Sequence, residues 1–279
     1  MSRHLKVWAE APGVNVISMQ HVKLSFGDVT LLNDISFSIA RGERVSLIGP
    51  GGSGKSTVLK LLLGLLSPDS GDISLLGTSM CDASERERQQ TLRKVGMAFQ
   101  QGALFDFMTV GENLTFAMEN MTDMSPKEIS TRIDSLLAGV KLGRTQNMFP
   151  FELSGGMQRR VGIARALATD PVVAIFDEPT AGLDPVTSTI ILNMILALSG
   201  EGADRAQLVV TSNVEIGIRF ADRLLILNEG RIIADGPWRE LLLHGSDWVR
   251  NFLGVRLIGL DLEYAHGLKL PQPFIDQHW

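Results

Sequence analysis

A glycine-rich segment, GPGGSGKST, runs from Gly49 to Thr57 and has the spacing of a phosphate-binding loop. It follows the strand-like run RVSLI and precedes the apolar, helix-like run VLKLLLGLL, which is the context that the pattern G-x-x-x-x-G-K-[ST] requires. Glycines let consecutive backbone N–H groups face one point, and the start of the new helix adds positive charge. Lys55 is expected to reach the β- and γ-phosphates, and Ser56 to offer a hydroxyl to Mg²⁺. The predicted phosphate site comprises Gly49, Pro50, Gly51, Gly52, Ser53, Gly54, Lys55, Ser56 and Thr57.

Two acidic residues, Asp177 and Glu178, follow the apolar run VVAIF. The carboxyl ends of parallel strands meet at one edge of a sheet, so we expect this pair to lie beside the phosphate-binding loop. Asp177 would hold Mg²⁺ through water, and Glu178 would polarise an attacking water as general base. Acids after a strand usually belong to a solvated loop. Their coincidence with the phosphate loop, and Pro179 fixing the turn, favours the catalytic interpretation.

The composition of the 279-residue chain excludes some classes of function. The 31 Asp and Glu outnumber the 26 Lys and Arg, which argues against a protein that coats nucleic acid. A single cysteine, Cys81, fits a reducing compartment. The N-terminal residues do not resemble a secretory signal, and the longest apolar run is too short to span a bilayer. We therefore expect any membrane role to depend on a partner.

The pattern of elements is typical of an α/β protein. Short strand-like runs fill the chain from about Val14 to Met80, interrupted by one apolar helix after Lys55. A helical region follows at about 109–170, and its clearest start is SPKE, in which Ser125 and Glu128 predict a capping box. After position 170, strands alternate with helices as in parallel α/β units.

A third motif, LSGG at 153–156, lies between the two nucleotide motifs. The order of the phosphate loop, FQ at 99–100, LSGG and DEPTAGLDP at 177–185 resembles an ATP-binding cassette (ABC) ATPase subunit, from about 16 to 241. The resemblance implies a RecA-like parallel-sheet core, an antiparallel β subdomain and a helical signature subdomain. We expect an N-terminal extension at 1–14, an ABC ATPase domain at 15–241 with its helical subdomain at about 103–170, and a C-terminal tail at 242–279.

The resemblance also implies roles for single residues. Ser154 would begin a helix whose amide groups Gly155 and Gly156 leave uncovered, which makes a second anion site. In the family this site closes over the γ-phosphate held by another subunit, so that a dimer encloses two ATP molecules, with Asp184 at the shared seam. Gln100 would touch Mg²⁺ or the attacking water and respond to the helical subdomain.

Two further positions are assigned by the resemblance. Phe26 falls where the family places an aromatic ring against adenine, although an aromatic residue in a strand is also commonly a packing residue. Ser212, in VVTSN, falls where the family has a histidine that contacts the γ-phosphate. A serine is several ångströms shorter in reach, so contact would need a backbone shift or a bridging water. We expect Ser212 to slow hydrolysis without preventing ATP binding.

The segment FQQGALFDFMTVGENL, the form ELSGGMQRR and the run DWVRNFL are similar to the Mla/Mce-type phospholipid-transport ATPases. A polar amino-acid importer remains an alternative, as does a soluble ABC ATPase that regulates a partner in iron–sulfur assembly. The first interpretation implies a second ATPase chain, a transmembrane permease and a lipid-binding Mce-domain protein, at the cytoplasmic face of the inner membrane.

We expect the permease to dock on Gln100 and residues 102–113, through Leu104, Phe105 and Met108. The apolar tail after Leu241 would pack on its own domain or, alternatively, contact the second chain or the permease.

Overall fold

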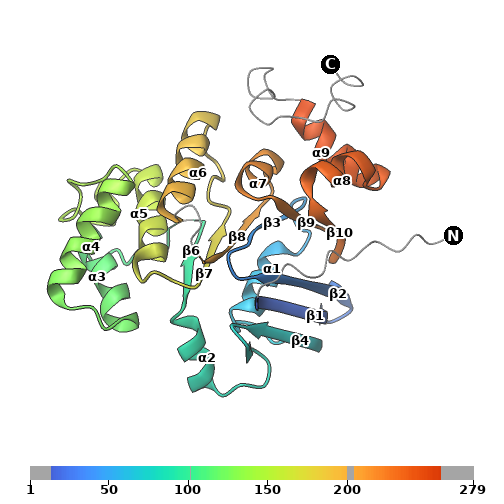
Figure 1. The fold of residues 1–279 in the computed structure, drawn as a ribbon, viewed down its shortest axis with the longest axis horizontal. Coiled ribbons are helices and arrows are strands. Elements are labelled where there is room, and N and C mark those ends of the chain that lie inside the picture. The colour runs from blue at the N-terminus through green and yellow to red at the C-terminus, as the bar shows by residue number, and fades with distance from the viewer. Residues whose placement is uncertain (1–13, 101, 200–203, 259–279) are drawn as a thin grey trace.

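The computed structural model describes residues 14–100, 102–199 and 204–258 (Figure 1). Most of the expected N-terminal extension, at 1–13, and the end of the expected tail, at 259–279, lie outside the described residues. The chain forms an antiparallel sheet, a mostly parallel sheet and two groups of helices at opposite ends of the molecule. The expected α/β fold with these three parts is confirmed.

The antiparallel sheet contains β1 (Asn15–Phe26), β2 (Val29–Ala40), β4 (Ser70–Leu75) and β5 (Thr78–Ser79), in the order β2-β1-β4-β5. A tight turn joins β1 to β2, with Phe26 paired to Val29 and Gly27 at a φ of 57°. The apolar side of this sheet packs into the same core as one side of the second sheet. The two sheets therefore share one core.

The second sheet contains β3 (Arg44–Ile48), β6 (Val95–Ala98), β7 (Val173–Asp177), β8 (Ala206–Thr211), β9 (Arg223–Asn228) and β10 (Arg231–Pro237). The order is β10-β9-β3-β8-β7-β6, and only β10 runs antiparallel to its neighbour. The central strands are mostly apolar because both faces are covered, although Ser46 in β3 and Gln207 and Thr211 in β8 are buried polar residues. The carboxyl ends of the adjacent strands β3, β8 and β7 thus meet at one edge.

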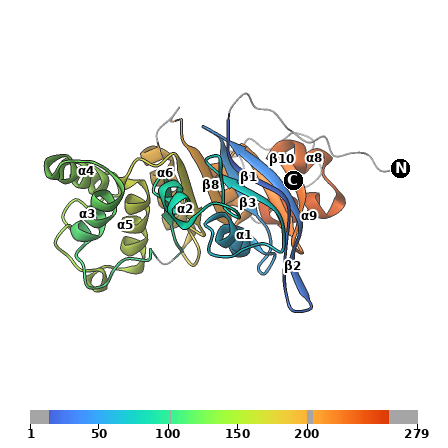
Figure 2. The same cartoon turned by 90° about the horizontal axis from the view of Figure 1, so that it is seen from below.

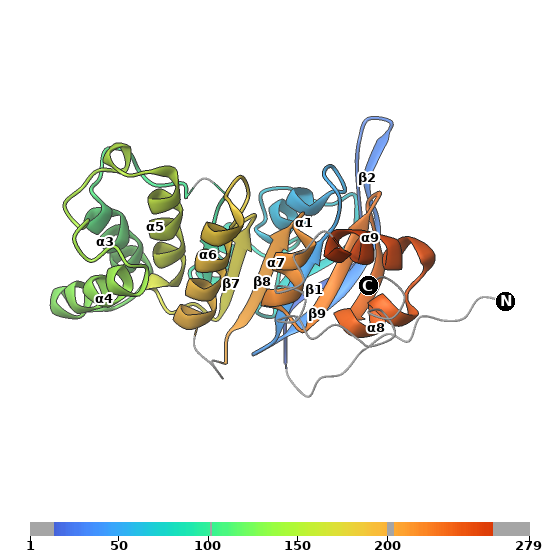
Figure 3. The ribbon, with the colours of Figure 1, turned by 90° about the horizontal axis from the view of Figure 1, so that it is seen from above.

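Side chains alternate between the two faces of this sheet. In β8, Val210 packs toward the antiparallel sheet and α1 (Lys55–Leu62), whereas Val209 packs against the opposite layer. That layer contains α5 (Gly155–Ala168), α6 (Pro185–Ser199) and α7 (Val214–Phe220), and Figure 3 shows α6 and α7 lying along it. The β3 strand and α1 helix therefore run through the middle of the molecule.

The helical part contains α3 (Val110–Met121), α4 (Pro126–Gly139), a short 3-10 turn at Pro150–Glu152 and the start of α5. The expected capping box is confirmed, because Ser125 accepts from the Glu128 amide and Glu128 accepts from the Ser125 amide. The helices enclose their own apolar cluster, which includes Leu114, Ile133 and Val161. They lie beyond β6 at one end of the molecule, whereas α2 (Glu85–Leu92) lies apart from them and contacts β5 (Figure 1 and Figure 2).

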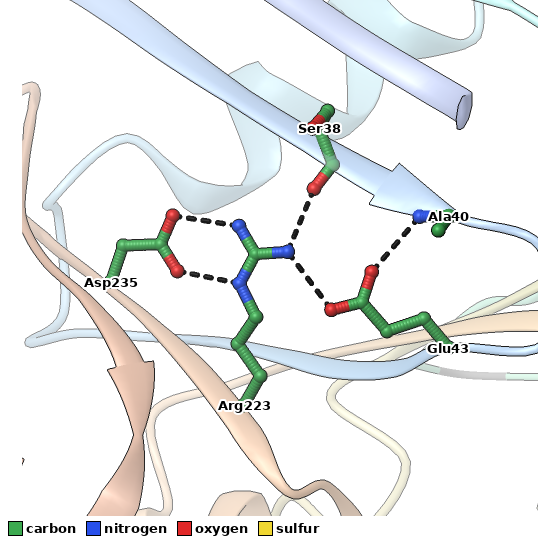
Figure 4. Close-up of polar contacts among 5 residues, drawn as sticks. All are labelled: Ser38, Ala40, Glu43, Arg223 and Asp235. Atoms are coloured by element: carbon green, nitrogen blue, oxygen red, sulfur yellow. Dashed lines mark hydrogen bonds and ion pairs between the residues drawn. The ribbon is translucent and has the colours of Figure 1, made fainter. Parts of the chain in front are cut away.

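A half-buried arginine ties the two sheets together (Figure 4). Arg223, at the start of β9, donates to both carboxylate oxygens of Asp235 in β10, at 2.6 and 2.7 Å. It also donates to Glu43 at 2.9 Å and to the Ser38 carbonyl of β2 at 3.0 Å. Burial opposes its charge, but the hydrogen bonds and charges of Asp235 and Glu43 outweigh this and raise the pKa of Arg223. The cluster joins the amino ends of β3 and β9 to the carboxyl end of the antiparallel β10, opposite to the edge with the candidate site.

The chain continues from β10 into α8 (Trp238–His244) and α9 (Asp247–Ile258). Leu242, Val249 and Leu253 pack into one cluster with residues of β9 and α7, so this part of the expected tail packs on its own domain. The expected boundary after Leu241 falls within α8. Each helix in the described ranges is too short or too polar to span a membrane.

Candidate nucleotide-binding site

The glycine-rich loop connects β3 directly to α1. Glycine is the only residue type that fits at position 49, because a Cβ there would lie 2.1 Å from the Leu227 carbonyl oxygen of β9. Gly54 precedes α1 with a φ of 107°, and no side chain caps the first amides of the helix. Those amides are the positive end of the helix dipole and are available to an anion.

Lys55 is the first residue of α1 and is only 7% exposed. Its ammonium group donates to the carbonyls of Gly49 at 2.8 Å and Pro50 at 2.9 Å, which holds it against the inside of the loop. Ser56 is exposed, while the hydroxyl of Ser53 is buried without a hydrogen-bond partner in the described residues. An unsatisfied buried hydroxyl is costly unless a ligand engages it, so this loop fits a phosphate group.

Asp177 ends β7 and Glu178 follows it, as expected, at the edge shared with the loop. Burial, and then the charge of Glu178, raise the pKa of Asp177, while Lys55 lowers it. A divalent cation would relieve the repulsion between these acids. The described residues contain no cluster of three or more His, Cys, Asp or Glu that could hold a metal alone. Mg²⁺ here would thus take most of its ligands from phosphate and water, as it prefers.

Glu178 adopts a left-handed backbone conformation, with a φ of 43°. Its amide donates to the Val210 carbonyl at 2.8 Å, and its carboxylate accepts from the Thr211 hydroxyl at 2.9 Å and the Ser212 amide at 2.8 Å. A non-glycine residue at positive φ is strained and persists only where its surroundings fix it. The end of β8 therefore fixes both the backbone and the carboxylate of Glu178.

Thr211, which ends β8, and the two polar residues after it form hydrogen bonds with other groups of the chain. Thr211 is fully buried, and its hydroxyl oxygen also accepts from the Asn213 amide at 3.0 Å. The Asn213 side chain caps α7 by accepting from the Ile216 amide at 3.1 Å. Ser212 is half-buried, and its backbone contacts Glu178. Its expected effect on hydrolysis stays a prediction.

Gln100 lies two residues beyond the end of β6 and is exposed. The guanidinium of Arg159, on α5, donates to the Gln100 carbonyl at 3.1 Å and to the Ala181 carbonyl at 2.7 Å. Arg165 on the same helix donates to the carbonyls of Ala103 and Gly102 at 2.8 and 3.2 Å. The segment around Gln100 is thus held by the LSGG helix, and Arg159 also reaches the loop after Glu178.

The LSGG segment forms the start of α5. Ser154 is the N-cap, and its hydroxyl accepts from the Met157 amide at 3.3 Å. Gly155 is exposed, Gly156 is half-buried, and a Cβ added at either would meet nothing within 4 Å. The start of α5 is therefore open around these glycines, and the expected second anion site stays a prediction.

The structure places the two remaining predicted residues at the surface. Phe26 ends β1 and its side chain is 55% exposed, so it is not a core residue. Asp184 precedes α6, where it accepts from the amide and hydroxyl of Thr187 at 2.9 and 2.6 Å. The Thr187 hydroxyl, and then its amide, lower the pKa of Asp184, so the exposed carboxylate stays ionised.

Sequence reasoning gave no role to three features that the structure reveals. Thr211 contacts Glu178, and Arg159 joins two loops. Phe107 and Phe116 contact Phe105 on the surface beside Gln100, with ring centroids at 5.7 and 5.2 Å. The repeated phenylalanines of ALFDFM were a signal for the last feature. Nothing in the spacing of the sequence indicates the first two.

The comparisons with known proteins agree with this geometry. Residues 32–181, more than half of the 279-residue chain, match the family model described as "ABC transporter". A dimeric ATP-binding cassette in a post-hydrolysis state, bound to ADP and Pi, superposes with a TM-score of 0.70 at 32% identity, covering 79% of this chain and 98% of that one.

Three curated relatives cover most of the chain. Protein TRIGALACTOSYLDIACYLGLYCEROL 3, chloroplastic, of Arabidopsis thaliana is 39% identical over 85% of this chain and 73% of its own length. A probable amino-acid ABC transporter ATP-binding protein of Sinorhizobium fredii is 39% identical over 88% and 99%. The intermembrane phospholipid transport system ATP-binding protein MlaF of Haemophilus influenzae is 34% identical over 86% and 90%.

The loop after β3, the acid pair after β7 and the family match lead to one conclusion. The chain belongs to the ABC transporter family, as an ATP-binding subunit that hydrolyses ATP.

Proposed function

We propose that two copies of this chain enclose ATP and Mg²⁺ between them and drive a permease that moves phospholipids or other hydrophobic molecules. The transported class rests on one observation, the 34% identity to a phospholipid-transport ATPase over 90% of its length. A relative with an amino-acid transporter name is 39% identical over 99% of its length, which keeps a polar amino-acid importer as the second candidate.

Each nucleotide would need parts of two chains. The uncapped start of α1 and the open start of α5 lie in separate packing units, one in the central core and one in the helical part. In a sandwich, Ser154, Gly155 and Gly156 of one chain would meet the phosphates held by the other, with Asp184 nearby. The related cassette is a dimer, which supports this arrangement.

The residues of one chain would share the work of hydrolysis. The amides of the loop, Lys55 and the Ser53 hydroxyl bind phosphate oxygens, and Phe26 offers a ring to the adenine. Ser56, Asp177 and Gln100 would hold Mg²⁺, which neutralises phosphate charge as the bond to the leaving group breaks. Glu178 would orient the attacking water and take its proton.

A cluster of exposed phenylalanines supports a membrane partner, and we call Phe105, Phe107 and Phe116 the aromatic surface. Phe107 is 75% exposed; Phe105 and Phe107 follow the segment that Arg159 and Arg165 hold, and Phe116 joins them from α3. Exposed aromatic clusters are typical of protein interfaces. A permease helix bound here could therefore move with the LSGG helix. This would place the chain at the cytoplasmic face of the inner membrane.

The dimer can be tested with Glu178→Gln, which keeps the size of the side chain but removes the base. We expect this variant to form a stable dimer in ATP and Mg²⁺ by light scattering, while the parent chain turns over and dissociates. A variant that stays monomeric, both alone and with its partner, would contradict the shared site.

The partner and the substrate can be tested by purifying the tagged full chain from its native membranes. We expect a permease and an Mce-domain protein to accompany it, and vesicles of phosphatidylethanolamine and phosphatidylglycerol to stimulate its ATPase. Stimulation by free amino acids instead would favour the importer, and the absence of any membrane partner would favour the soluble class. Phe107→Asp should release the permease, whereas Leu65→Asp, at another exposed apolar residue, should not.

A further inference from the structure

We propose that Thr211 is a positioning residue for Glu178, so that the polar segment after β8 acts on the general base. This inference rests on the proposed role of Glu178. Three consecutive residues at and just after the end of β8 contact Glu178: Val210 through its carbonyl, Thr211 through its hydroxyl and Ser212 through its backbone amide. Both carboxylate oxygens are engaged, one by each of the last two donors.

The direction of the Thr211 hydrogen bond is fixed by its other neighbour. The backbone N–H of Asn213 can only donate, and it donates to the Thr211 hydroxyl oxygen at 3.0 Å. The single hydroxyl proton of Thr211 is therefore left to point at Glu178 Oε2, 2.9 Å away. Thr211 is fully buried, so water does not compete for this proton. The contact is thus a directed hydrogen bond to an acceptor-only carboxylate.

The carboxylate needs such support because its backbone is strained. At a φ of 43° the main chain of Glu178 does not lie in a preferred well, and the carboxylate could turn about several bonds without its two donors. A general base acts only within hydrogen-bond reach of the proton that it takes, so loss of orientation lowers the rate. Thr211 would keep the carboxylate in one rotamer.

The same geometry explains how a serine is compatible with position 212. The contact from Ser212 to Glu178 comes from the backbone amide, which every residue except proline supplies. Exchanging the side chain at 212 leaves this donor in place. The support of the base therefore depends on the Thr211 side chain and not on the residue that follows it.

The test uses the full chain, alone and with its membrane partner, and measures steady-state phosphate release and the binding of a fluorescent ATP analogue. Thr211→Val removes the donor at nearly constant volume, and we expect kcat to fall about 10- to 100-fold with little change in KM or nucleotide affinity. Thr211→Ser restores the hydroxyl and should recover most of the rate. Thr145→Val is the matched control, because it deletes a buried hydroxyl bonded to the Leu142 carbonyl in the helical part.

Other results would overturn the inference. A Thr211→Val rate equal to or above that of the parent, an equal fall in Thr145→Val, or a Thr211→Ser variant as slow as Thr211→Val would exclude positioning by the hydroxyl. If thermal denaturation shows that Thr211→Val is not folded, Thr211→Ala provides the same comparison. Failure of the base assignment itself is seen separately, because Glu178→Gln would then still hydrolyse ATP.

Discussion

The starts of α1 and α5 both contain glycines, and their surroundings differ. The start of α1 is enclosed, with Lys55 and Ser53 buried and the strand β9 directly behind Gly49. The start of α5 is open, its glycines face space, and its cap is the chain's own Ser154. Both expose amides that attract anions. Only the first adds a cation and buried surroundings, which fits a phosphate site within one chain, whereas the proposed role of the second is to complete the site of another chain.

The arginines of α5 sharpen this difference. Arg159, Arg160 and Arg165 all donate to backbone carbonyls, at Gln100 and Ala181, at Val140, and at Ala103 and Gly102 respectively. They therefore brace the helix against neighbouring segments, and Arg160 also donates to the Gly156 carbonyl in the first turn of α5 at 3.4 Å. The enclosed site is suited to bind a nucleotide, and we propose that the open one responds when another chain has bound it.

The largest expected effect is at the enclosed site. Lys55→Ala removes the only side-chain cation that the loop holds among the described residues, so we expect nucleotide binding to be lost and hydrolysis to fall about 100-fold or more. Lys60→Ala, an exposed lysine on the same helix, is the control and should bind normally. Fluorescent-nucleotide titration measures both, and tight binding by Lys55→Ala would show that the loop amides suffice.

The next effect is at the open site. Gly155→Asp places a carboxylate at the first position of α5, where it favours the helix but repels phosphate. We expect unchanged nucleotide binding, no dimer in ATP, and hydrolysis reduced about 100-fold. Gly143→Asp, at another exposed glycine of the helical part with free space around it, should behave as the parent. Loss of binding in Gly155→Asp would mean that α5 belongs to the nucleotide site of its own chain.

A smaller effect is expected where the two regions are connected. Arg159→Lys keeps a charge but cannot bind the Gln100 and Ala181 carbonyls with a planar fork. We expect the partner-stimulated rate to fall about three- to tenfold while the basal rate and nucleotide binding persist. Arg160→Lys, whose guanidinium binds Val140 within the helical part, is the control. Equal stimulation of Arg159→Lys and the parent would contradict the connection.

The sequence predicted features that depend on local spacing and missed those that depend on tertiary placement. The phosphate loop, the acids after β7 and the Ser125 capping box are each defined within nine residues or fewer, so their patterns are visible in the chain. The Thr211 hydroxyl meets Glu178 across 33 positions, and Arg159 meets Gln100 across 59. Contacts between segments so far apart in the chain follow from the tertiary fold and give no periodic pattern in the sequence. The exposure of Phe107 likewise depends on what the helices leave uncovered.

The smallest expected effect is at Ser212, between the enclosed site and the open one. A histidine there could donate to the developing charge on phosphate, and a positioned donor of that kind is worth up to about 10²- to 10³-fold. The Ser212 backbone amide and the Thr211 hydroxyl already orient Glu178 in this chain. Only the direct donor to phosphate is missing, so we expect the site to be assembled but to hydrolyse ATP slowly. We expect Ser212→His to raise kcat about tenfold at most, with ATP affinity unchanged, because the imidazole acts mainly in the closed geometry. Steady-state phosphate release from the purified complex measures this. A neutral or slower Ser212→His would show that a water or a group from the partner already supplies the donor, and parent turnover no higher than that of Glu178→Gln would show that the chain clamps nucleotide without turning it over.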